Sequence, residues 1–322
     1  MRAIIVEKTG GPEVLTLVER PDPVPGEGEL LVRVQAAGVN YVDTYQRTGL
    51  YPRDLPFVPG NEGAGVVTSV GPGVSAVAVG DLVAWATGDG SYAERVVIPA
   101  TQVVRVPEGV SAELAAAVLL QGLTAHFLTR DTYRLTAGSR CLIHAAAGGV
   151  GRLAVQLAKS EGAEVFATVG SPEKVEIARS AGADHVIDYR TEDFGAAVEA
   201  IAGPRALDVV YDGVGRATFS RGLDVLRPRG TMVTFGNASG PVEPVAPLTL
   251  MIKGSLYLTR PTLGDYVATA AELRARTADV LGRVAGGTLE VRIDATFSLA
   301  EAAQAHRRLE SRMTTGKLLL VP

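Results

Sequence analysis

The chain has 322 residues, 47% of them hydrophobic, and carries a formal net charge of −4. This length and apolar content are typical of about two globular domains, while the weak negative charge and the lack of any lysine- or arginine-rich run do not favour nucleic acid or an anionic membrane as partners. The single cysteine, Cys141, cannot form an internal disulfide or a cysteine-rich zinc site. We expect no stretch of membrane-spanning length and no secretory signal, so the sequence predicts a cytoplasmic enzyme.

Short β-branched runs dominate the first part of the chain, to about residue 120. They lie at 3–6, 29–34, 65–70, 82–85 and 95–98. Proline- and glycine-rich turns separate these runs. Many short strands with frequent turns are typical of a partly open barrel.

Strand and helix alternate from about residue 124 onward. The predicted strands lie at 140–145, 164–169, 185–187, 207–212 and 230–235. The predicted helices between them lie at 150–161, 172–181, 192–202 and 216–226. This alternation indicates a parallel sheet that is covered by helices on both faces and connected by right-handed crossovers.

The last part of the chain returns to a mixed pattern. It predicts a long helical stretch over 263–286, a strand at 289–293, a helix at 299–311 and a final strand at 317–321. We therefore expect a cofactor domain, residues 124–262, between two segments of a second domain, residues 1–123 and 263–322. An inserted domain of this kind indicates a cleft between two lobes.

The most informative motif is Ala145-Ala146-Ala147-Gly148-Gly149-Val150-Gly151, which follows a predicted strand and opens a predicted helix. Small residues let the backbone approach a pyrophosphate, and the unpaired N–H groups at a helix start favour an anion. The helix is amphipathic, with apolar residues at i, i+3, i+4, i+7 and i+8 from Val150. Strand, turn and helix together predict a dinucleotide site, although Ala146 stands where the usual fingerprint opens with glycine.

The end of the second strand of this domain indicates which cofactor binds. The NAD-binding form of the unit has an acidic residue here for the ribose 2′-hydroxyl, whereas this chain has Gly170 and Ser171. Lys174 follows one helical turn later, where its ammonium could meet a 2′-phosphate, and Tyr189 with Arg190 adds a hydroxyl and a second cation. Taken alone, Lys174 could equally lie on a solvated helix face. Together with the missing acid, these residues favour NADPH over NADH.

The segments Ala36–Asp43 and Val58–Gly65, with the glycine turn, resemble the medium-chain dehydrogenase/reductase superfamily. Its zinc alcohol dehydrogenases carry a cysteine ligand at the place of Asn40, a His-Glu pair at Asn61-Glu62 and a third ligand near Leu120-Gln121. The side chains at the soft-ligand positions of this chain cannot make the tetrahedral nitrogen and sulfur site that zinc requires. We therefore expect no metal.

The zinc-free branch that the whole chain resembles is the quinone oxidoreductase family, which includes the zeta-crystallins. The resemblance rests on residues 40–45, 145–151, 256–261 and 309–312, and the last two segments look closest to the bacterial NADPH:quinone reductases. It implies a GroES-like, partly open β-barrel catalytic domain and a Rossmann domain, a doubly wound parallel sheet that binds NADPH.

The resemblance also implies a set of cofactor-binding residues. The pyrophosphate would be held by Ala147, Gly148, Gly149 and Val150. The adenosine and its 2′-phosphate would be surrounded by Gly170, Ser171, Lys174, Tyr189 and Arg312. The nicotinamide side would be lined by Phe235, Gly236, Asn237, Leu256 and Leu258, with Asn40 and Tyr41 reaching from the catalytic domain.

Without a metal, the substrate must already be a good electrophile, such as a quinone or an activated enone, aligned with the nicotinamide C4 in a dry cleft. Tyr45 and Tyr51 are candidates for lining the acceptor pocket, with ordinary packing as the alternative. Asn40 is a candidate for bonding the nicotinamide ribose or the acceptor oxygen, or for holding its own loop together. Asp43 could brace that loop or take part in proton transfer, and no acid–base catalyst is compelled.

Three functions remain open at this point. Reduction of a quinone by NADPH is the main prediction, and reduction of an enone or enoyl thioester is the alternative within the enzyme class. The third is a non-catalytic NADPH-binding protein of a crystallin-like or RNA-binding kind. The resemblance further implies a homodimer through the cofactor domain, with residues 231–235 and 254–258 at the edge.

Overall fold

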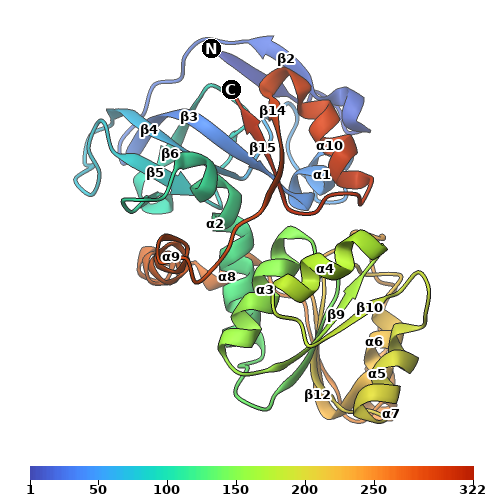
Figure 1. The fold of residues 1–322 in the computed structure, drawn as a ribbon. Coiled ribbons are helices and arrows are strands. Elements are labelled where there is room, and N and C mark those ends of the chain that lie inside the picture. Colours follow the sequence, from blue (N-terminus) through green and yellow to red (C-terminus); the bar gives the residue numbers. More distant parts are fainter. The chain divides into compact units, whose positions relative to one another are not determined.

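A six-stranded parallel sheet organises residues 124–265 of the computed structural model, which describes residues 1–322 (Figure 1). Its strands, in spatial order, are β10 (His185–Asp188), β9 (Glu164–Val169), β8 (Arg140–Ile143), β11 (Leu207–Asp212), β12 (Leu226–Thr234) and β13 (Tyr257–Thr259). Counted from β8, this order is 3-2-1-4-5-6, which is the arrangement of the Rossmann dinucleotide-binding fold. The predicted doubly wound sheet is confirmed.

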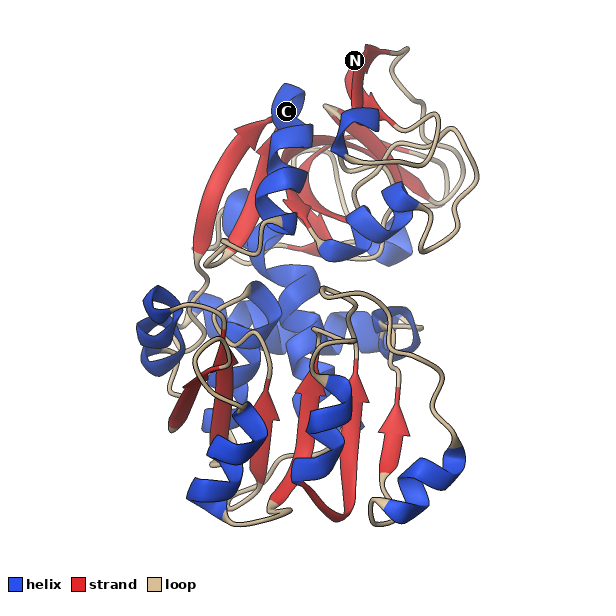
Figure 2. Cartoon of the chain, turned by 90° about the vertical axis from the view of Figure 1, so that its right-hand side faces the viewer, coloured by secondary structure: helices blue, strands red, loops and turns tan.

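Helices cover both faces of this sheet, and Figure 2 shows its strands all running in one direction. They are α3 (Gly149–Ser160), α4 (Pro172–Ser180), α5 (Phe194–Ala202), α6 (Phe219–Val225) and α7 (Pro247–Ile252). Leu142, Phe166 and Val210, on three neighbouring strands, form the centre of a buried core with residues of α5 and α6. We call this part of the chain, Thr124–Asp265, unit 2.

The remaining residues, Met1–Leu123 and Tyr266–Pro322, form unit 1. Its main sheet has the order β14 (Ile293–Ser298), β15 (Lys317–Val321), β3 (Glu29–Val39), β4 (Glu62–Val70), β5 (Leu82–Trp85) and β7 (Val104–Arg105), with β6 (Arg95–Pro99) also on β3. A separate hairpin pairs β1 (Arg2–Ile5) with β2 (Thr16–Glu19). Because β15 lies antiparallel to β3, the end of the chain belongs to the same sheet as its beginning.

Helices complete unit 1. They are α1 (Tyr41–Thr48), α2 (Ala112–Phe127, which runs on into unit 2), α8 (Leu263–Tyr266, which begins in unit 2), α9 (Ala270–Ala285) and α10 (Ala302–Glu310). Short turns of helix lie at η1 (Pro12–Val14), η2 (Ala100–Gln102), η3 (Leu128–Thr132, at the end of α2) and η4 (Leu299–Glu301). Neither α1 nor α2 is apparent from the strand-rich pattern of the first 120 residues.

Two predictions for the last part of the chain are wrong in detail. The predicted helical stretch over 263–286 is interrupted, because Thr269 and Glu272 cap each other: the Thr269 amide donates to Glu272 Oε2 at 3.0 Å and starts α9 afresh. The predicted strand at 289–293 is displaced, since β14 begins only at Ile293, where the chain comes into register with Lys317 of β15. Pairing with a distant strand sets this boundary.

One segment reaches the length and apolar content of a membrane span, contrary to our expectation. It is Ala112–Thr132, with a mean hydropathy of 1.3 in its most apolar window. Since 78% of that window is buried inside the protein, the apolar residues of this segment are accounted for by core packing.

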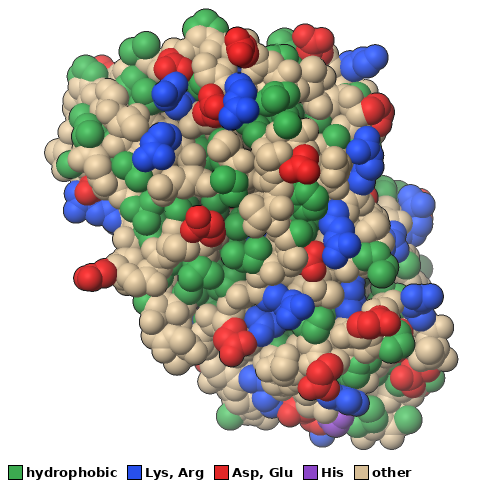
Figure 3. Space-filling model, turned by 45° about the horizontal axis from the view of Figure 1, so that its top comes forward, with side chains coloured by type: hydrophobic (Ala, Val, Ile, Leu, Met, Phe, Trp, Pro, Cys, Tyr) green, Lys and Arg blue, Asp and Glu red, His purple; other side chains and the backbone are tan.

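Charged side chains of both signs are interspersed over the face of the molecule drawn in Figure 3. In the protein as a whole, many charged side chains are paired, as with Arg308 and Asp294 at 3.2 Å and Arg140 and Glu164 at 2.8 Å. Pairs of this kind on the surface add little to stability. Their consequence is that the face presents no field of a single sign.

Candidate active site

The turn after β8 has the geometry of a phosphate cradle. The Gly148 amide donates to the Ala145 carbonyl at 2.8 Å, and Ala145 itself has a φ of 52° in the left-handed region. Gly148 caps α3 but offers no side chain, so the first-turn N–H groups have no side-chain acceptor. A Cβ at residue 151 would lie 2.3 Å from the Ala145 carbonyl oxygen, so only glycine permits this close approach of helix and turn. These residues fit a pyrophosphate.

The carboxyl end of β9 gathers the residues predicted to surround the adenosine and its 2′-phosphate. The Tyr189 phenol lies so close over Gly170 that a Cβ there would be 2.4 Å from its oxygen. The Arg190 guanidinium donates to the Gly170 carbonyl at 3.4 Å. A hydrogen bond from Ser171 lowers the pKa of the exposed Glu173 carboxyl, and the charges of Arg190 and Lys174 lower that pKa further. The structure thus brings both cations, together with the Glu173 carboxylate, close to the neutral residues Gly170 and Ser171 at the end of β9.

At the carboxyl end of β12, Phe235, Gly236 and Asn237 follow the strand directly. Gly236 lies against the loop after β11, because a Cβ at residue 236 would be 2.3 Å from the Gly213 carbonyl oxygen. The Arg260 guanidinium, just beyond β13, donates to the Gly236 carbonyl at 3.0 Å. In its better orientation the Asn237 amide also accepts from Arg260, at 3.0 Å. Ligands of parallel sheets bind at this edge, so Arg260 becomes a candidate site residue that we did not predict.

The structure does not bring Leu256 to that edge. Thr231 pairs with Tyr257 and Met232 with Leu258, so Leu256 lies at the amino end of β13, where its side chain is only 6% exposed and belongs to the core of unit 2. Leu258 is partly buried against the same core. Both had been expected to line the nicotinamide side. Arg260, in the same segment 256–261, directly follows the carboxyl end of β13. Its place after the strand is the signal that the sequence offered.

In unit 1, Asn40 lies in a buried polar network rather than at an open surface. Its Oδ1 accepts from Lys317 Nζ at 2.7 Å and from Gln121 Nε2 at 3.4 Å. Its Nδ2 donates to Glu62 Oε2 at 2.8 Å and to the Gly38 carbonyl at 3.3 Å. All the hydrogen-bonding capacity of the amide is engaged. Of the two interpretations of Asn40, the geometry favours the one in which it holds its loop together.

The same residues do not fit a zinc ion. Asn40, Glu62 and Gln121 stand at or beside the ligand positions, but Glu62 Oε2 already accepts from Lys317 Nζ at 2.5 Å, and its Oε1 accepts from the Leu120 amide at 2.7 Å. Structural zinc prefers thiolate and imidazole ligands, and the donors here are amides, one carboxylate and an ammonium. No chemistry of this chain is assigned to zinc.

Asp43 braces the start of α1. Its Oδ2 accepts from the Asn40 amide at 2.8 Å and from the Tyr92 hydroxyl at 3.0 Å, and its Oδ1 accepts from Asn61 Nδ2 at 2.7 Å. Complete burial nevertheless raises the pKa of this carboxyl to about 6. Because all three contacts are internal, the geometry favours the bracing role over proton transfer to a substrate.

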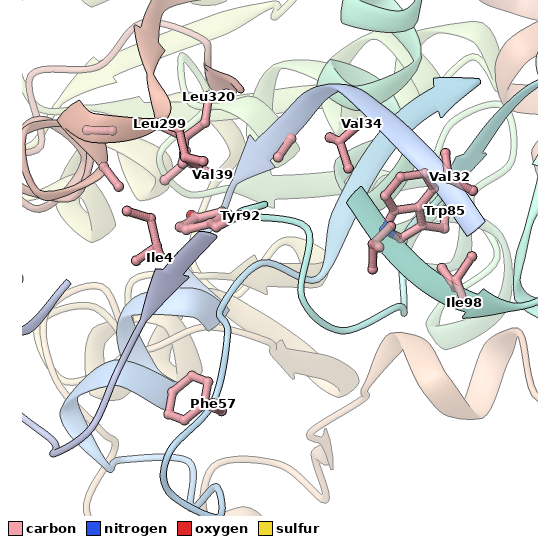
Figure 4. Close-up of a cluster of buried hydrophobic side chains, with 14 of the residues drawn as sticks. Ile4, Val32, Val34, Val39, Phe57, Trp85, Tyr92, Ile98, Leu299 and Leu320 are labelled. Atoms are coloured by element: carbon pink, nitrogen blue, oxygen red, sulfur yellow. The ribbon is translucent and has the colours of Figure 1, made fainter. Parts of the chain in front are cut away.

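A directed chain of hydrogen bonds extends from Asp43 through Tyr92, whose ring lies in the hydrophobic core of Figure 4. His306 Nε2 is 3.1 Å from the Tyr92 hydroxyl, and Arg47 is 2.9 Å from His306 Nδ1. Arginine can only donate, so Nδ1 accepts, Nε2–H donates to Tyr92, and Tyr92 donates to Asp43. Burial and the Arg47 charge lower the pKa of His306 to about 3, which keeps the imidazole neutral. Arg47 is itself paired with Glu310 at 2.6 Å.

Three tyrosines lie together along α1 and the loop after it. The rings of Tyr41 and Tyr45 are 6.0 Å apart, and those of Tyr45 and Tyr51 are 5.1 Å apart and nearly edge-on. Tyr51 is the exposed member, whereas Tyr45 is nearly buried. Arg312, the last predicted cofactor residue, follows α10 in unit 1 and has a φ of 60°. The other predicted residues of the 2′-phosphate site belong to unit 2.

Comparison with known proteins agrees with both halves of this description. Residues 26–108 match the family model of the alcohol dehydrogenase GroES-like domain, and residues 149–277 match that of zinc-binding dehydrogenases. The quinone oxidoreductase of Pseudomonas aeruginosa is 47% identical over 315 residues, which cover 97% of each chain. The 2-haloacrylate reductase of a Burkholderia species is 38% identical over 99% of this chain and 98% of its own.

Among solved structures, Escherichia coli quinone oxidoreductase complexed with NADPH superimposes with a TM-score of 0.98 at 44% identity, and each chain is covered completely. The fold, the replaced metal ligands and these full-length similarities all indicate the same family. The chain belongs to the quinone oxidoreductase family, in the zinc-free branch of the medium-chain dehydrogenase/reductase superfamily.

Proposed function

We propose that this protein is an NADPH-dependent quinone oxidoreductase. The observation that carries the proposal is the neutral, cation-bearing end of β9, next to a glycine turn that fits a pyrophosphate. Unit 2 serves as the cofactor domain and unit 1 as the catalytic domain. The full-length similarity to quinone oxidoreductases, one of them solved with NADPH, supports the same activity.

Ala147, Gly148, Gly149 and Val150 would hold the pyrophosphate through backbone N–H groups. Gly170, Ser171, Lys174, Tyr189 and Arg190 would hold the adenosine end, with Arg312 contributed by unit 1. Phe235, Gly236 and Asn237 would flank the nicotinamide, with Arg260 fixing their loop. NADPH supplies the hydride when it is bound, and the task of the protein is to orient it and to exclude water.

Tyr45 and Tyr51 are the side chains we propose for the acceptor pocket. Their adjacent rings offer flat apolar surfaces to a quinone, and the exposed phenol of Tyr51 can donate to a carbonyl oxygen. Asn40 and Tyr41 act by shaping the loop before α1, since the Asn40 amide is engaged internally and the Tyr41 hydroxyl donates to the Leu309 carbonyl at 3.1 Å. Water is a sufficient proton source for a hydroquinone anion.

The test of the cofactor assignment is Lys174→Ala, with Arg179→Ala as the matched control on the same helix. Arg179 is exposed in the last turn of α4, so Arg179→Ala removes one positive charge from the helix, as Lys174→Ala does. We expect the Kd for NADPH to rise roughly tenfold in Lys174→Ala, the loss of one charge-assisted phosphate contact, and the Kd for NADH to stay unchanged. An unchanged Kd for NADPH would show that the 2′-phosphate lies elsewhere.

Turnover with 1,4-naphthoquinone, a simple alkenal and 2-chloroacrylate under one set of conditions tests the acceptor. The similarity to a 2-haloacrylate reductase is the specific observation that favours reduction of a C=C bond as the second candidate. We expect the quinone to have the highest kcat/KM. Turnover of the alkenes alone would establish the second candidate, and tight NADPH binding without any turnover would establish a non-catalytic role.

We further propose a homodimer formed through unit 2. β13 is the outer strand of the parallel sheet, and an open strand edge favours pairing. Around it lie exposed apolar side chains: Leu248, Met251, Ile252 and Tyr257. In sedimentation, Ile252→Glu should release monomers, whereas Ile201→Glu, which changes an exposed isoleucine on α5, should not. A wild-type monomer at micromolar concentration would refute the proposal.

A cytoplasmic location is part of the proposal, and a chain with one cysteine, which cannot form an internal disulfide, is consistent with it. The formal net charge of −4 does not favour an extended polyanion such as RNA as a partner.

A further inference from the structure

A buried ammonium lies where the zinc-binding relatives of this fold would place their metal. Lys317, the first residue of β15, is 1% exposed, and its Nζ lies 2.7 Å from Asn40 Oδ1 and 2.5 Å from Glu62 Oε2. Asn40 and Glu62 come from the two segments that carry metal ligands in the alcohol dehydrogenases, and Gln121, from the third, reaches Asn40 at 3.4 Å. Lys317 therefore bonds directly to two of the three segments, and the Asn40 side chain links it to the third.

We propose that Lys317 is the fixed cation that takes the place of a zinc ion in this chain, and that it acts as a positioning residue for the Asn40–Tyr41 loop. The catalytic part of this proposal rests on the proposed quinone reductase function. The structural part is that Asn40 Oδ1 and Glu62 Oε2 form a cation site that Lys317 occupies. This part does not depend on the proposed function.

The hydrogen-bonding chemistry of the site requires a donor at this position. An amide side chain can be turned so that its oxygen and nitrogen exchange places. Here an ammonium, which only donates, faces Asn40 Oδ1, and a carboxylate, which only accepts, faces Asn40 Nδ2. The pair fixes a single orientation of Asn40, whose backbone amide in turn donates to Asp43 at the start of α1.

The space for this arrangement is kept open by Gly38. A Cβ at residue 38 would lie 2.3 Å from Glu62 Oε2 and 2.6 Å from the Ala116 carbonyl oxygen. Burying an ion pair is by itself weak evidence of a gain in stability, because both charges lose their hydration. The buried pair of Lys317 and Glu62 is therefore better explained by its role in fixing the orientation of Asn40 than by a gain in stability.

Zinc and Lys317 compete for the same two oxygens. A metal ion could use Asn40 Oδ1 and Glu62 Oε2 as ligands only after the ammonium had been displaced into a buried site without other partners. We therefore expect the wild-type protein to bind no stoichiometric zinc when it is purified with excess zinc. One tightly bound zinc ion per chain would overturn the proposal.

Chemical rescue of Lys317→Ala tests the cation site directly. The variant is refolded in ethylammonium chloride, or in tetramethylammonium chloride at the same concentration, which matches charge and ionic strength but has no N–H donor. We expect Lys317→Ala to have a lower Tm than the wild type. We also expect its kcat/KM with the quinone to be roughly ten- to a hundredfold lower, as for a displaced active-site loop. Ethylammonium should restore both with saturation, and tetramethylammonium should restore neither. Equal responses to the two salts, or no response to either, would refute the proposal.

The paired variant Lys317→Met/Glu62→Gln covers the case in which Lys317→Ala does not fold, because it buries no unpaired charge. We expect this variant to fold and its kcat to fall more than its Kd for NADPH rises, while Lys317→Arg keeps most of the activity. Full activity of the paired variant would refute the positioning role. A wild-type protein without quinone turnover would instead refute the proposed function, and rescue of the Tm would still decide the cation site.

Discussion

The hydrogen-bonded chain from Arg47 to Asp43 predicts an unusual dependence of stability on pH, which His306→Gln should expose. Glutamine keeps an acceptor for Arg47 and a donor for Tyr92 but does not titrate. In the folded protein burial lowers the pKa of His306 from 6.5 to about 3, and burial raises the pKa of Asp43 from 3.8 to about 6. The two residues therefore contribute to the free energy of unfolding with opposite signs.

Below about pH 6.5 the unfolded chain protonates His306 and the folded protein does not, so acidification costs stability through His306. Between about pH 6 and 4 the folded protein protonates Asp43 and the unfolded chain does not, so acidification adds stability through Asp43. At about 1.4 kcal/mol for each unit of pKa difference, the loss from pH 7 to pH 4 is about 3 kcal/mol and the gain is about 2 kcal/mol. The two contributions nearly cancel in the wild type.

The assay is urea unfolding of wild type and His306→Gln at intervals from about pH 7 to pH 4. All other titrating groups cancel in the difference between the two proteins. Relative to the wild type, we expect His306→Gln to gain about 3 kcal/mol of unfolding free energy on acidification, the wild-type loss that it no longer suffers. A difference that stays constant with pH would mean that His306 is not held neutral in the folded protein, and the deduced direction of the chain would be wrong.

Three further substitutions test single contacts. Gly38→Ala should destabilise the protein by about 3 kcal/mol in urea unfolding, because its Cβ would displace the buried Glu62 carboxylate; an undiminished midpoint would contradict the packing described. Tyr92→Phe should cost about 2 kcal/mol in the same assay, since it leaves the buried His306 Nε2–H donor without a partner and removes one of the two hydrogen bonds to Asp43 Oδ2. A loss below about 0.5 kcal/mol would argue against the chain of hydrogen bonds. Gly170→Ala should weaken NADPH binding roughly tenfold in fluorescence titration by pushing the Tyr189 phenol away. Stability should change little, because the Tyr189 side chain that must move is exposed, and unaltered binding would remove Tyr189 from the cofactor site.

Five of the six strands of unit 2 were predicted, each to within four residues at either end, because each has a short apolar stretch at its centre. The sixth strand, β13, was not predicted as a strand. β9 and β11 have the predicted limits, and β8 ends only two residues early. The start of β14 was missed because its limit depends on pairing with β15, and nothing in residues 289–293 themselves marks it. Local patterns predict local elements well, and distant pairing sets the rest.

The candidate site divides in the same way. The glycine turn and the neutral end of β9 are contiguous in sequence and could be read directly. The ion pair of Lys317 with Glu62 joins residues 255 positions apart, and no spacing rule connects them. The position of Leu256 at the amino end of β13 could not be predicted either. A sequence segment shows which residues are apolar, but the end of the strand at which each one lies depends on the register with β12.

The order of segments along the chain has a consequence for synthesis on the ribosome. Unit 2 is one continuous stretch, so it can fold as soon as it has emerged. Unit 1 must wait, because the partner strand of β3, the helix that carries His306 and the lysine that neutralises Glu62 are all translated after unit 2 is complete. Until then β3 lacks the strand that completes its end of the sheet, and open strand edges of incompletely folded domains favour aggregation.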